Sequence, residues 1–392
     1  MNLASYLARY PNVRVAGPAD NDRILAFYRK LSMQGGAFNI LFVKDPDYFR
    51  YLRFESAVTA VGLVEDDGGN MEGMFTFGVR PCYVGGQRAS TVHVSDLRFM
   101  RSRERKTKFV WKEVGRDLCA DSHTIDEFAG ARYLMGSFVM ANKRARQAIA
   151  SHKAPFDISP VANYKMVNLF GRKPLKWAGW RRKSKVAVDI ARGTDDDREP
   201  LRAFLDKQSR RRALGYVYAG PDDELGRRLR DWDNFSLASF FIARNDGGAI
   251  VGCFAPWDLA GGRRIVVDSF PRGLAAAAAV IRPLARKIPR PGDELRILYL
   301  TTQEIDLELP PVERNAVFGA LLDALYASDL PAAYHMVAVC DYGNESLLPV
   351  IEPSYFTMST DTMLYQLCLP GAAEVVREGE LKCHAGHEMC LT

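Results

Sequence analysis

Hydrophobic and polar positions alternate along one stretch of the chain and then recur at helical spacing. The alternation over residues 90–100 predicts a β-strand, because successive side chains of a strand point to opposite faces. Further on, Val114 and Leu118 fall on one face of a helix, which we expect over about residues 105–121. Between the two lies the segment 101–108, in which five of the eight residues are Arg or Lys. A basic loop that leads from a strand into a helix N-terminus favours the binding of an anion such as phosphate.

The same order of elements is predicted twice along the chain. Over residues 12–170, a strand is followed by two helices, three strands, a helix, a strand, a helix and a last strand, at 161–170. Over residues 186–369 this order returns, with strands expected at 237–244, 249–258, 263–269 and 294–302 and a long helix at 312–328. The second run also contains an insertion, the alanine-rich segment 274–286, which has high helix propensity. A repeated order of elements indicates an internal duplication.

The segment 171–185 separates the two runs and has no regular period. It contains seven Lys or Arg residues and two Trp residues. We interpret it as a linker between a domain of residues 1–170 and a domain of residues 186–392. Basic residues interleaved with tryptophan can bind a membrane surface or nucleic acid, and they can equally pack a linker onto two domains. Cleavage within 171–185 is expected to leave two fragments with native-like helix and strand content, unless the face between the domains is large and apolar.

The fold class predicted from these elements is α/β, with two tandem domains. Each domain is expected to hold a mixed, mostly antiparallel twisted sheet flanked by helices. The length of 392 residues fits two domains, and a hydrophobic content of 47% provides for a large core. No apolar run reaches the length of a membrane span, and the N-terminus lacks the pattern of a signal peptide. Seven dispersed cysteines favour buried thiols in a reducing cytosol, so a cytoplasmic protein is expected.

The net charge of +6 is compatible with a polyanionic ligand and does not by itself indicate nucleic acid. The order of elements, together with the segment 94–98, resembles the GCN5-related N-acetyltransferase superfamily, and the resemblance spans both halves. Segment 94–98 looks like the fourth strand of that family. The loop that follows this strand in the family reads Arg/Gln-x-x-Gly-x-Gly/Ala, and its backbone N–H groups hold the pyrophosphate of acetyl-CoA. Here the loop is residues 105–110, in which the arginine is kept and both glycines are absent.

The resemblance implies a donor site for acetyl-CoA or another acyl-CoA, mainly in the N-terminal domain. Segment 313–319, the counterpart in the second half, matches the family loop less well and carries less positive charge. Asn142 follows a strand that resembles the family's fifth, which splays from the fourth to admit the acyl chain. The residues implied to bind the donor are Leu97, Arg98, Phe99, Arg105, Lys106, Thr107, Lys108, Phe109, Val110 and Asn142.

Acyl transfer to an amine needs a base for the ammonium proton and an acid for the leaving thiolate. The residues expected to be catalytic are Asp96, Glu72 and Tyr342, the last at a position where the family often has a tyrosine acid. Other candidates have side chains suited to the same chemistry, and each of them could instead serve the core or a salt bridge. These are His93, Ser95, Glu304 and Asp306.

The expected function is an acyl-CoA-dependent N-acyltransferase acting on an amine of a small molecule or peptide. Two alternatives stay open: an aminoacyl-tRNA-dependent transferase of the same tandem fold, which the basic loop and linker would suit, and a non-catalytic binding or regulatory protein. Near the C-terminus, Cys383, His384, His387 and Cys390 could form a zinc-like cluster. Their spacing matches no standard module, so no metal is expected.

Overall fold

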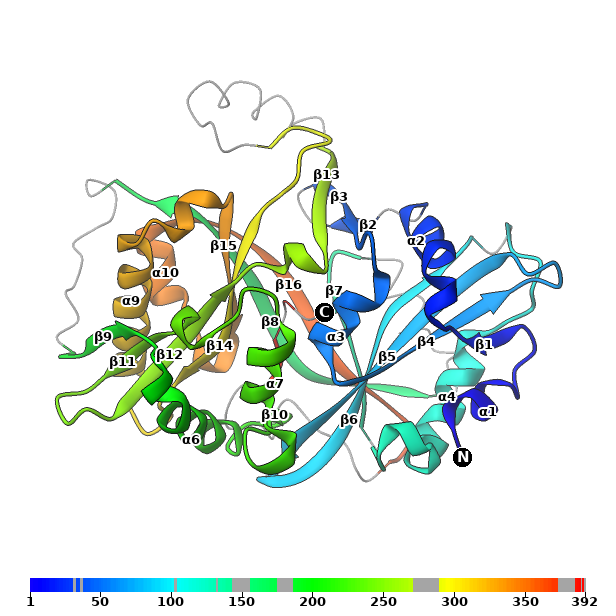
Figure 1. The fold of residues 1–392 in the computed structure, drawn as a ribbon, viewed down its shortest axis with the longest axis horizontal. Coiled ribbons are helices and arrows are strands. Elements are labelled where there is room, and N and C mark those ends of the chain that lie inside the picture. Colours follow the sequence, from blue (N-terminus) through cyan, green and yellow to red (C-terminus); the bar gives the residue numbers. More distant parts are fainter. Residues whose placement is uncertain are drawn as a thin grey trace.

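The computed structural model describes residues 1–30, 33–35, 38–101, 104–131, 133–142, 156–174, 186–270, 289–372, 385–388 and 390. One mixed sheet of 13 strands runs through both halves of the molecule, and helices flank it (Figure 1). A separate three-stranded sheet is formed by β13 (Arg264–Ser269), β3 (Phe38–Val43) and β2 (Met33–Gly35). It links the two halves, because β3 belongs to the first and β13 to the second.

The sheet contains the same strand order twice. The first half contributes β1 (Val13–Val15), β4 (Val58–Glu65), β5 (Met71–Val84), β6 (Gln87–Phe99) and β7 (Tyr133–Val139). The second half contributes β9 (Asp189–Arg192), β11 (Phe241–Arg244), β12 (Ile250–Trp257), β14 (Ile297–Ile305) and β15 (Met336–Tyr342). In each half the last two strands pair in parallel and the others are antiparallel. This repeat confirms the predicted fold of two tandem units.

The last strand of each run pairs with a strand of the other run. The strand β8 (Asp157–Arg172) comes from the first run but pairs with β15, while the strand β16 (Tyr355–Cys368) comes from the second run and pairs with β7. These two long strands pair with each other in the middle of the sheet, with Tyr164 opposite Thr362 (Figure 1). A pseudo-two-fold axis therefore passes close to this pair. The placement of the domain boundary at 171–185 stays a prediction, and residues 175–185 lie outside the described residues.

Helices cover the sheet in each half. The first half has α1 (Leu3–Leu7), α2 (Asn21–Arg29), α3 (Tyr48–Glu55) and α4 (Trp111–Asp121). The second half has α6 (Arg198–Ser209), α7 (Glu224–Asp231), α9 (Pro311–Ala327) and α10 (Leu348–Ser354). Of the described helices, none is both long enough and apolar enough to cross a membrane.

One apolar core joins the two halves. Phe54 of α3 packs edge-on against Trp257 of β12, with 5.3 Å between ring centroids, and Trp257 stacks on Trp232 at 3.8 Å. These rings belong to a single buried cluster that draws on α2 and α3 as well as α6 and β12. Separate clusters lie under α1 and α4 in the first half and under α9 and α10 in the second. The halves are therefore fused by buried apolar contact as well as by the sheet.

Two local predictions need correction, and two others fall outside the described residues. The helix expected from residue 105 begins at Trp111, because the preceding residues form a loop that is held by Glu72. The strand expected at 263–269 leaves the main sheet as β13, and β14 takes its place beside β12. The helix expected over 142–151 lies from residue 143 onward outside the described residues, as does the segment 274–286.

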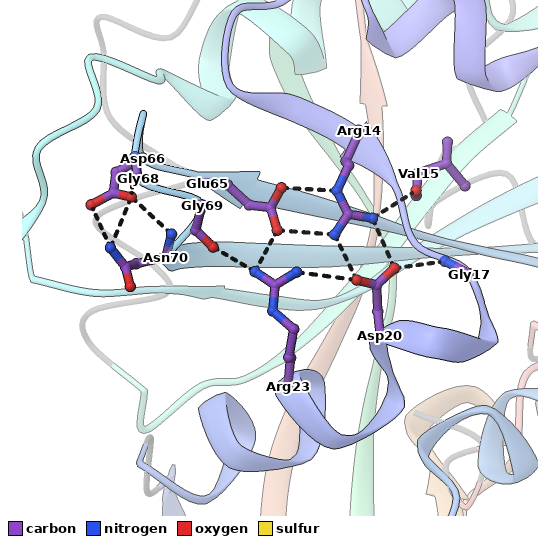
Figure 2. Close-up of polar contacts among 10 residues, drawn as sticks. All are labelled: Arg14, Val15, Gly17, Asp20, Arg23, Glu65, Asp66, Gly68, Gly69 and Asn70. Atoms are coloured by element: carbon purple, nitrogen blue, oxygen red, sulfur yellow. Dashed lines mark hydrogen bonds and ion pairs between the residues drawn. The ribbon is translucent and has the colours of Figure 1, made fainter.

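A network of charged side chains ties the edge of the first half together (Figure 2). The Arg14 guanidinium donates to both carboxylate oxygens of Asp20, at 2.8 and 2.6 Å, and also binds Glu65. Arg23 of α2 reaches the same two carboxylates, at 3.3 Å from Asp20 and 2.7 Å from Glu65. The network joins β1 to the start of α2 and to the end of β4. The hydrogen bonds from Arg14 lower the pKa of Asp20 to about 2.

Replacing Asp20 by Asn should lower the free energy of unfolding at pH 7 by about 1–2 kcal/mol, less than the full pKa shift because Arg14 is partly exposed. The folded-state pKa lies below the unfolded one, so this stability is present above about pH 4 and is lost as the pH falls through about 2. Urea unfolding between pH 7 and pH 2 measures it. The two proteins should converge at the acid end. Asp22→Asn, at an exposed position two residues later, is the control and should be neutral; equal midpoints for both variants would rule the network out as a source of stability.

Candidate functional site

The parallel pair β6 and β7 opens into a splay in the first half. The two strands pair only from Thr91 to His93 with Tyr133 to Met135. Beyond that point β6 continues beside β5 with an irregular register, and Asp96 takes a positive φ of 45°. A non-glycine residue in that region bends the strand locally. The bend turns β6 away from β7 and leaves a gap between their C-terminal ends.

The second half has the same geometry at the equivalent place. β14 and β15 pair only from Ile297 to Tyr299, and Thr302 takes a positive φ of 49° three residues after the last pair. The two splays differ in exposure. In the first, residues 95–99 and 137–139 are half-buried, whereas in the second nearly all of residues 301–305 and 339–342 are buried. Among the described residues, the side chains along the splay of the first half are therefore the more exposed.

The chain's own C-terminal segment, described at residues 385–388 and 390, packs against the second splay and lines a cavity there together with residues of β14 and β15. The Glu388 carboxylate accepts the backbone N–H of Thr302 at 3.0 Å and the Arg228 guanidinium at 2.7 Å. Arg80 donates to the carbonyl of Gly386 at 3.1 Å, and the Tyr342 hydroxyl donates to the carbonyl of His387. Contacts from both halves thus hold this segment between them.

His93 and Glu55 form a dyad where the first splay begins. The Nδ1 atom of His93 lies 3.1 Å from Oε1 of Glu55, at the end of α3. An ionised carboxylate can only accept, so Nδ1 donates to Glu55, and in the neutral imidazole Nε2 is then the acceptor. The Nε2 atom is buried and has no hydrogen-bond partner in the part of the chain that the structure describes. His93 and Met135 are the last paired residues before the gap. Both line a cavity whose wall also includes Arg80.

A second imidazole lines the same cavity. The ring of His387 lies 5.7 Å from the ring of His93 and 5.7 Å from that of Tyr164, measured between centroids. Burial lowers the pKa of His387 well below its usual range, and the neighbouring His93 and Arg80 add to this effect, so the ring stays neutral.

Asp96, expected to be catalytic, lies in a buried ionic cluster. Its carboxylate binds Nζ of Lys44 at 2.5 Å and the hydroxyl of Tyr48 at 2.7 Å, with Arg98 at 3.4 Å. Burial alone would raise its pKa, but the charges of Lys44 and Arg98 hold it well below the usual range. Burial in turn lowers the pKa of Lys44 to about 8. A carboxylate so strongly stabilised as an anion is a weak base, and its contacts fix the bend of β6.

The other two residues expected to be catalytic are also engaged. Glu72 accepts the backbone N–H groups of Lys106 and Thr107, at 2.5 and 2.9 Å. Tyr342 lies in the second half beside the C-terminal segment, and burial raises its pKa well above the usual value, which keeps the hydroxyl protonated. In that half, Glu304 is paired with Arg212 at 2.6 Å. Asp306 accepts from Gln208, and Ser95 contacts Thr76.

The residues expected to bind the donor surround the open splay and its basic loop. Leu97, Arg98 and Phe99 lie at the end of β6, and Asn142 follows the end of β7. Phe109 is buried and stacks on Phe99, with 5.6 Å between centroids.

Within the loop itself, Arg105 donates to the carbonyl of Phe109 at 3.2 Å and Lys106 pairs with Asp66 at 2.9 Å. The side chains of Lys108 and Val110 are exposed. The structure therefore brings a basic loop and the open groove to one end of β6.

Sequence reasoning identified His93 but missed its partner. Glu55 is 38 residues away from His93 on another element, so no local pattern could join them. The role of the C-terminal segment was missed for the same reason. Cys383 and His384 lie outside the described residues, and no group of three or more metal-ligating side chains occurs within the described ones.

The comparisons with known proteins found matches to solved structures and none to the sequence. No model of a known protein family matches the sequence, and no curated protein matches it. The fold matches Saccharomyces cerevisiae N-myristoyltransferase with bound myristoyl-CoA, with a TM-score of 0.54 and 9% identity over 91% of this chain and 83% of that one. It also matches a fungal protein with a GCN5-related glucosamine N-acetyltransferase region, with a TM-score of 0.56 and 12% identity over 91% of this chain and 38% of the other.

At this level of identity the matches establish the fold. The chain has the fold of the GCN5-related N-acetyltransferases, in a tandem arrangement consistent with that of N-myristoyltransferase. The predicted resemblance is confirmed for the fold.

Proposed function

We propose that this chain, built on the tandem acetyltransferase fold, is an acyl-CoA-dependent N-acyltransferase whose donor site lies in the first half. The observation that carries the proposal is the His93–Glu55 dyad at the mouth of the open splay between β6 and β7. The fold neighbour with bound myristoyl-CoA supports an acyl-CoA donor, with acetyl-CoA as one member of that class. The acceptor is an amine of a small molecule or a peptide.

The chemistry follows from the position of His93. An amine is protonated at neutral pH and must lose a proton before it can attack a thioester. The Nε2 lone pair of His93 takes this proton, directly or through one water, while Glu55 stabilises the imidazolium through Nδ1. The amine nitrogen then bonds to the acyl carbon, and the carbon–sulfur bond breaks. The leaving group is a thiolate, the weak conjugate base of a thiol, so it can depart without a dedicated acid.

The remaining predicted residues have positioning or binding roles in this proposal. Asp96 maintains the bend of β6 through Lys44 and Arg98. The basic loop, with Arg105 and the exposed Lys106 and Lys108, provides positive charge for the phosphates of the donor. The second half completes the cavity wall through the C-terminal segment.

Replacing Arg105, Lys106 and Lys108 together with Gln should weaken CoA binding at least about tenfold, which is roughly 1.4 kcal/mol. Several converging charge-assisted hydrogen bonds are lost, while part of each aliphatic side chain and its polar character are kept. Calorimetric titration with CoA, acetyl-CoA and myristoyl-CoA measures the effect, and thermal unfolding checks that the variant is folded.

The control is a second triple variant with the same change in charge on α6 and α7, at Arg202, Lys207 and Arg230. It should bind CoA like the natural protein. Equal CoA affinity of a folded loop variant would show that the loop is merely a solvated basic face. Absence of binding by the natural protein to all three ligands would contradict the proposed function.

No feature of the described residues favours the aminoacyl-tRNA-dependent or the non-catalytic alternative over an acyl-CoA transferase. A steep fall of ligand affinity with salt would point to RNA, since neutralising many phosphates releases many counterions.

A further inference from the structure

Two backbone N–H groups of the basic loop are occupied by a carboxylate of the chain itself. The Glu72 side chain is 3% exposed, and each of its oxygens accepts one hydrogen bond, from Lys106 at 2.5 Å and from Thr107 at 2.9 Å. Burial of the carboxylate would raise its pKa, but these bonds lower it, so Glu72 is an anion in the folded protein. The loop therefore already holds one bound negative charge.

A second carboxylate engages the charged side chain of the same loop. Asp66 lies 2.9 Å from Nζ of Lys106, and it also accepts the N–H groups of Gly68 and Asn70 in the turn between β4 and β5 (Figure 2). This fixes Asp66 in the turn, and Lys106 reaches over to it. Two backbone amides and one lysine of the loop are thus bound by acidic residues of the chain itself, which lie in β5 and in the β4–β5 turn.

A carboxylate with two parallel acceptor oxygens uses the same donors as two oxygens of a phosphate. The loop lacks the glycines that ease the close approach of a pyrophosphate to the backbone, and the amides of residues 106 and 107 are the ones that a carboxylate already engages. The side chain of Lys106 is exposed, so its ammonium group can form an ion pair with such an anion.

We propose that Glu72 is an internal competitor for the donor phosphates, which occupies the amides of Lys106 and Thr107 until a phosphate displaces it. The inference rests on the proposed function for the identity of the natural ligand, but the competition itself is a property of the loop. It implies that the negative charge of Glu72 and the reach of its side chain weaken phosphate binding in the natural protein.

The test uses the full chain, inorganic pyrophosphate as a probe of the loop, and CoA as a probe of the proposed function. Glu72→Gln keeps the side-chain shape and removes the charge, and Glu72→Asp keeps the charge but shortens the side chain so that it no longer spans both amides. Glu113→Gln is the control, because Glu113 is exposed in the first turn of α4 and its replacement changes the net charge equally.

Both Glu72 variants should bind pyrophosphate at least about tenfold more tightly than the natural protein and Glu113→Gln. Hydrogen exchange should place the effect: the amides of residues 106 and 107 should exchange faster in Glu72→Gln, and pyrophosphate should slow them again. Thermal unfolding identifies any variant that is not folded, and the other Glu72 variant then carries the comparison.

Equal pyrophosphate affinity of Glu72→Gln and Glu113→Gln would overturn the proposal, since charge alone would then explain any gain. Amides that pyrophosphate leaves unprotected would overturn it as well. Tighter pyrophosphate binding without CoA binding in any variant would support competition at the loop and contradict the proposed acyl-CoA donor. CoA that binds equally tightly to all four proteins would support the proposed acyl-CoA donor and contradict competition by Glu72 at the loop.

Discussion

Replacing His93 by Gln should lower kcat for acyl transfer at least about 100-fold while leaving donor affinity nearly unchanged. General-base catalysis typically contributes about 10²–10⁴ in rate, and glutamine cannot take up the ammonium proton. Because Nδ1 is held by Glu55 and the buried Nε2 has no hydrogen-bond partner among the described residues, the effect is expected on the chemical step. Release of free thiol from acyl-CoA at saturating amine measures kcat, and calorimetry with CoA measures donor affinity.

Glu55→Gln tests the dyad further. The imidazole remains, but its stabilising carboxylate is gone, so a smaller loss of about tenfold is expected together with an altered pH profile. His123→Gln is the matched control, because His123 is exposed in a short helical turn after α4. A His93→Gln variant with the kcat of His123→Gln would exclude His93 as the base.

The local elements of this fold could be predicted from periodicity, whereas strand partners could not. Alternation indicated β6 correctly, because Val92 and Val94 face an apolar core while the polar Thr91, His93 and Ser95 lie on the other face. The repeated order of elements indicated two units. The exchange of β8 and β16 has no local signature, since a strand's own pattern does not specify which edge it joins. The start of α4 depended on Glu72, which is more than 30 residues upstream of the loop that it holds.

The candidate site was predictable only in part, for a similar reason. His93 could be singled out because an imidazole on the central strand has the right chemistry. Its partner Glu55, the ionic partner Lys44 of Asp96 and the C-terminal segment all come from distant parts of the chain. Buried charges are the hardest to foresee, because charged residues are mostly exposed unless a tertiary partner neutralises them. Arg228, in a helix rich in arginine, illustrates this point.

Replacing Arg228 by Met should destabilise the protein by about 3–5 kcal/mol, the range for removing one member of a buried ion pair. Arg228 is fully buried, and it binds Glu224 of its own helix and Glu388 of the C-terminal segment, each at 2.7 Å. Its guanidinium also lies 4.5 Å from the ring centre of Trp232. Glu224 keeps Arg227 as a partner in the variant, but the Glu388 carboxylate is left with the Thr302 N–H. Urea unfolding measures the loss.

A second substitution distinguishes the effect of the unpaired charge from the effect of lost packing. Adding Glu388→Gln to Arg228→Met removes the stranded charge, so the double variant should be more stable than Arg228→Met alone. Arg230→Met changes the same charge at an exposed position of the same helix and should stay within about 0.5 kcal/mol of the natural protein. If the double variant were less stable than Arg228→Met, packing around the guanidinium, rather than its charge, would hold the C-terminal segment between the two halves.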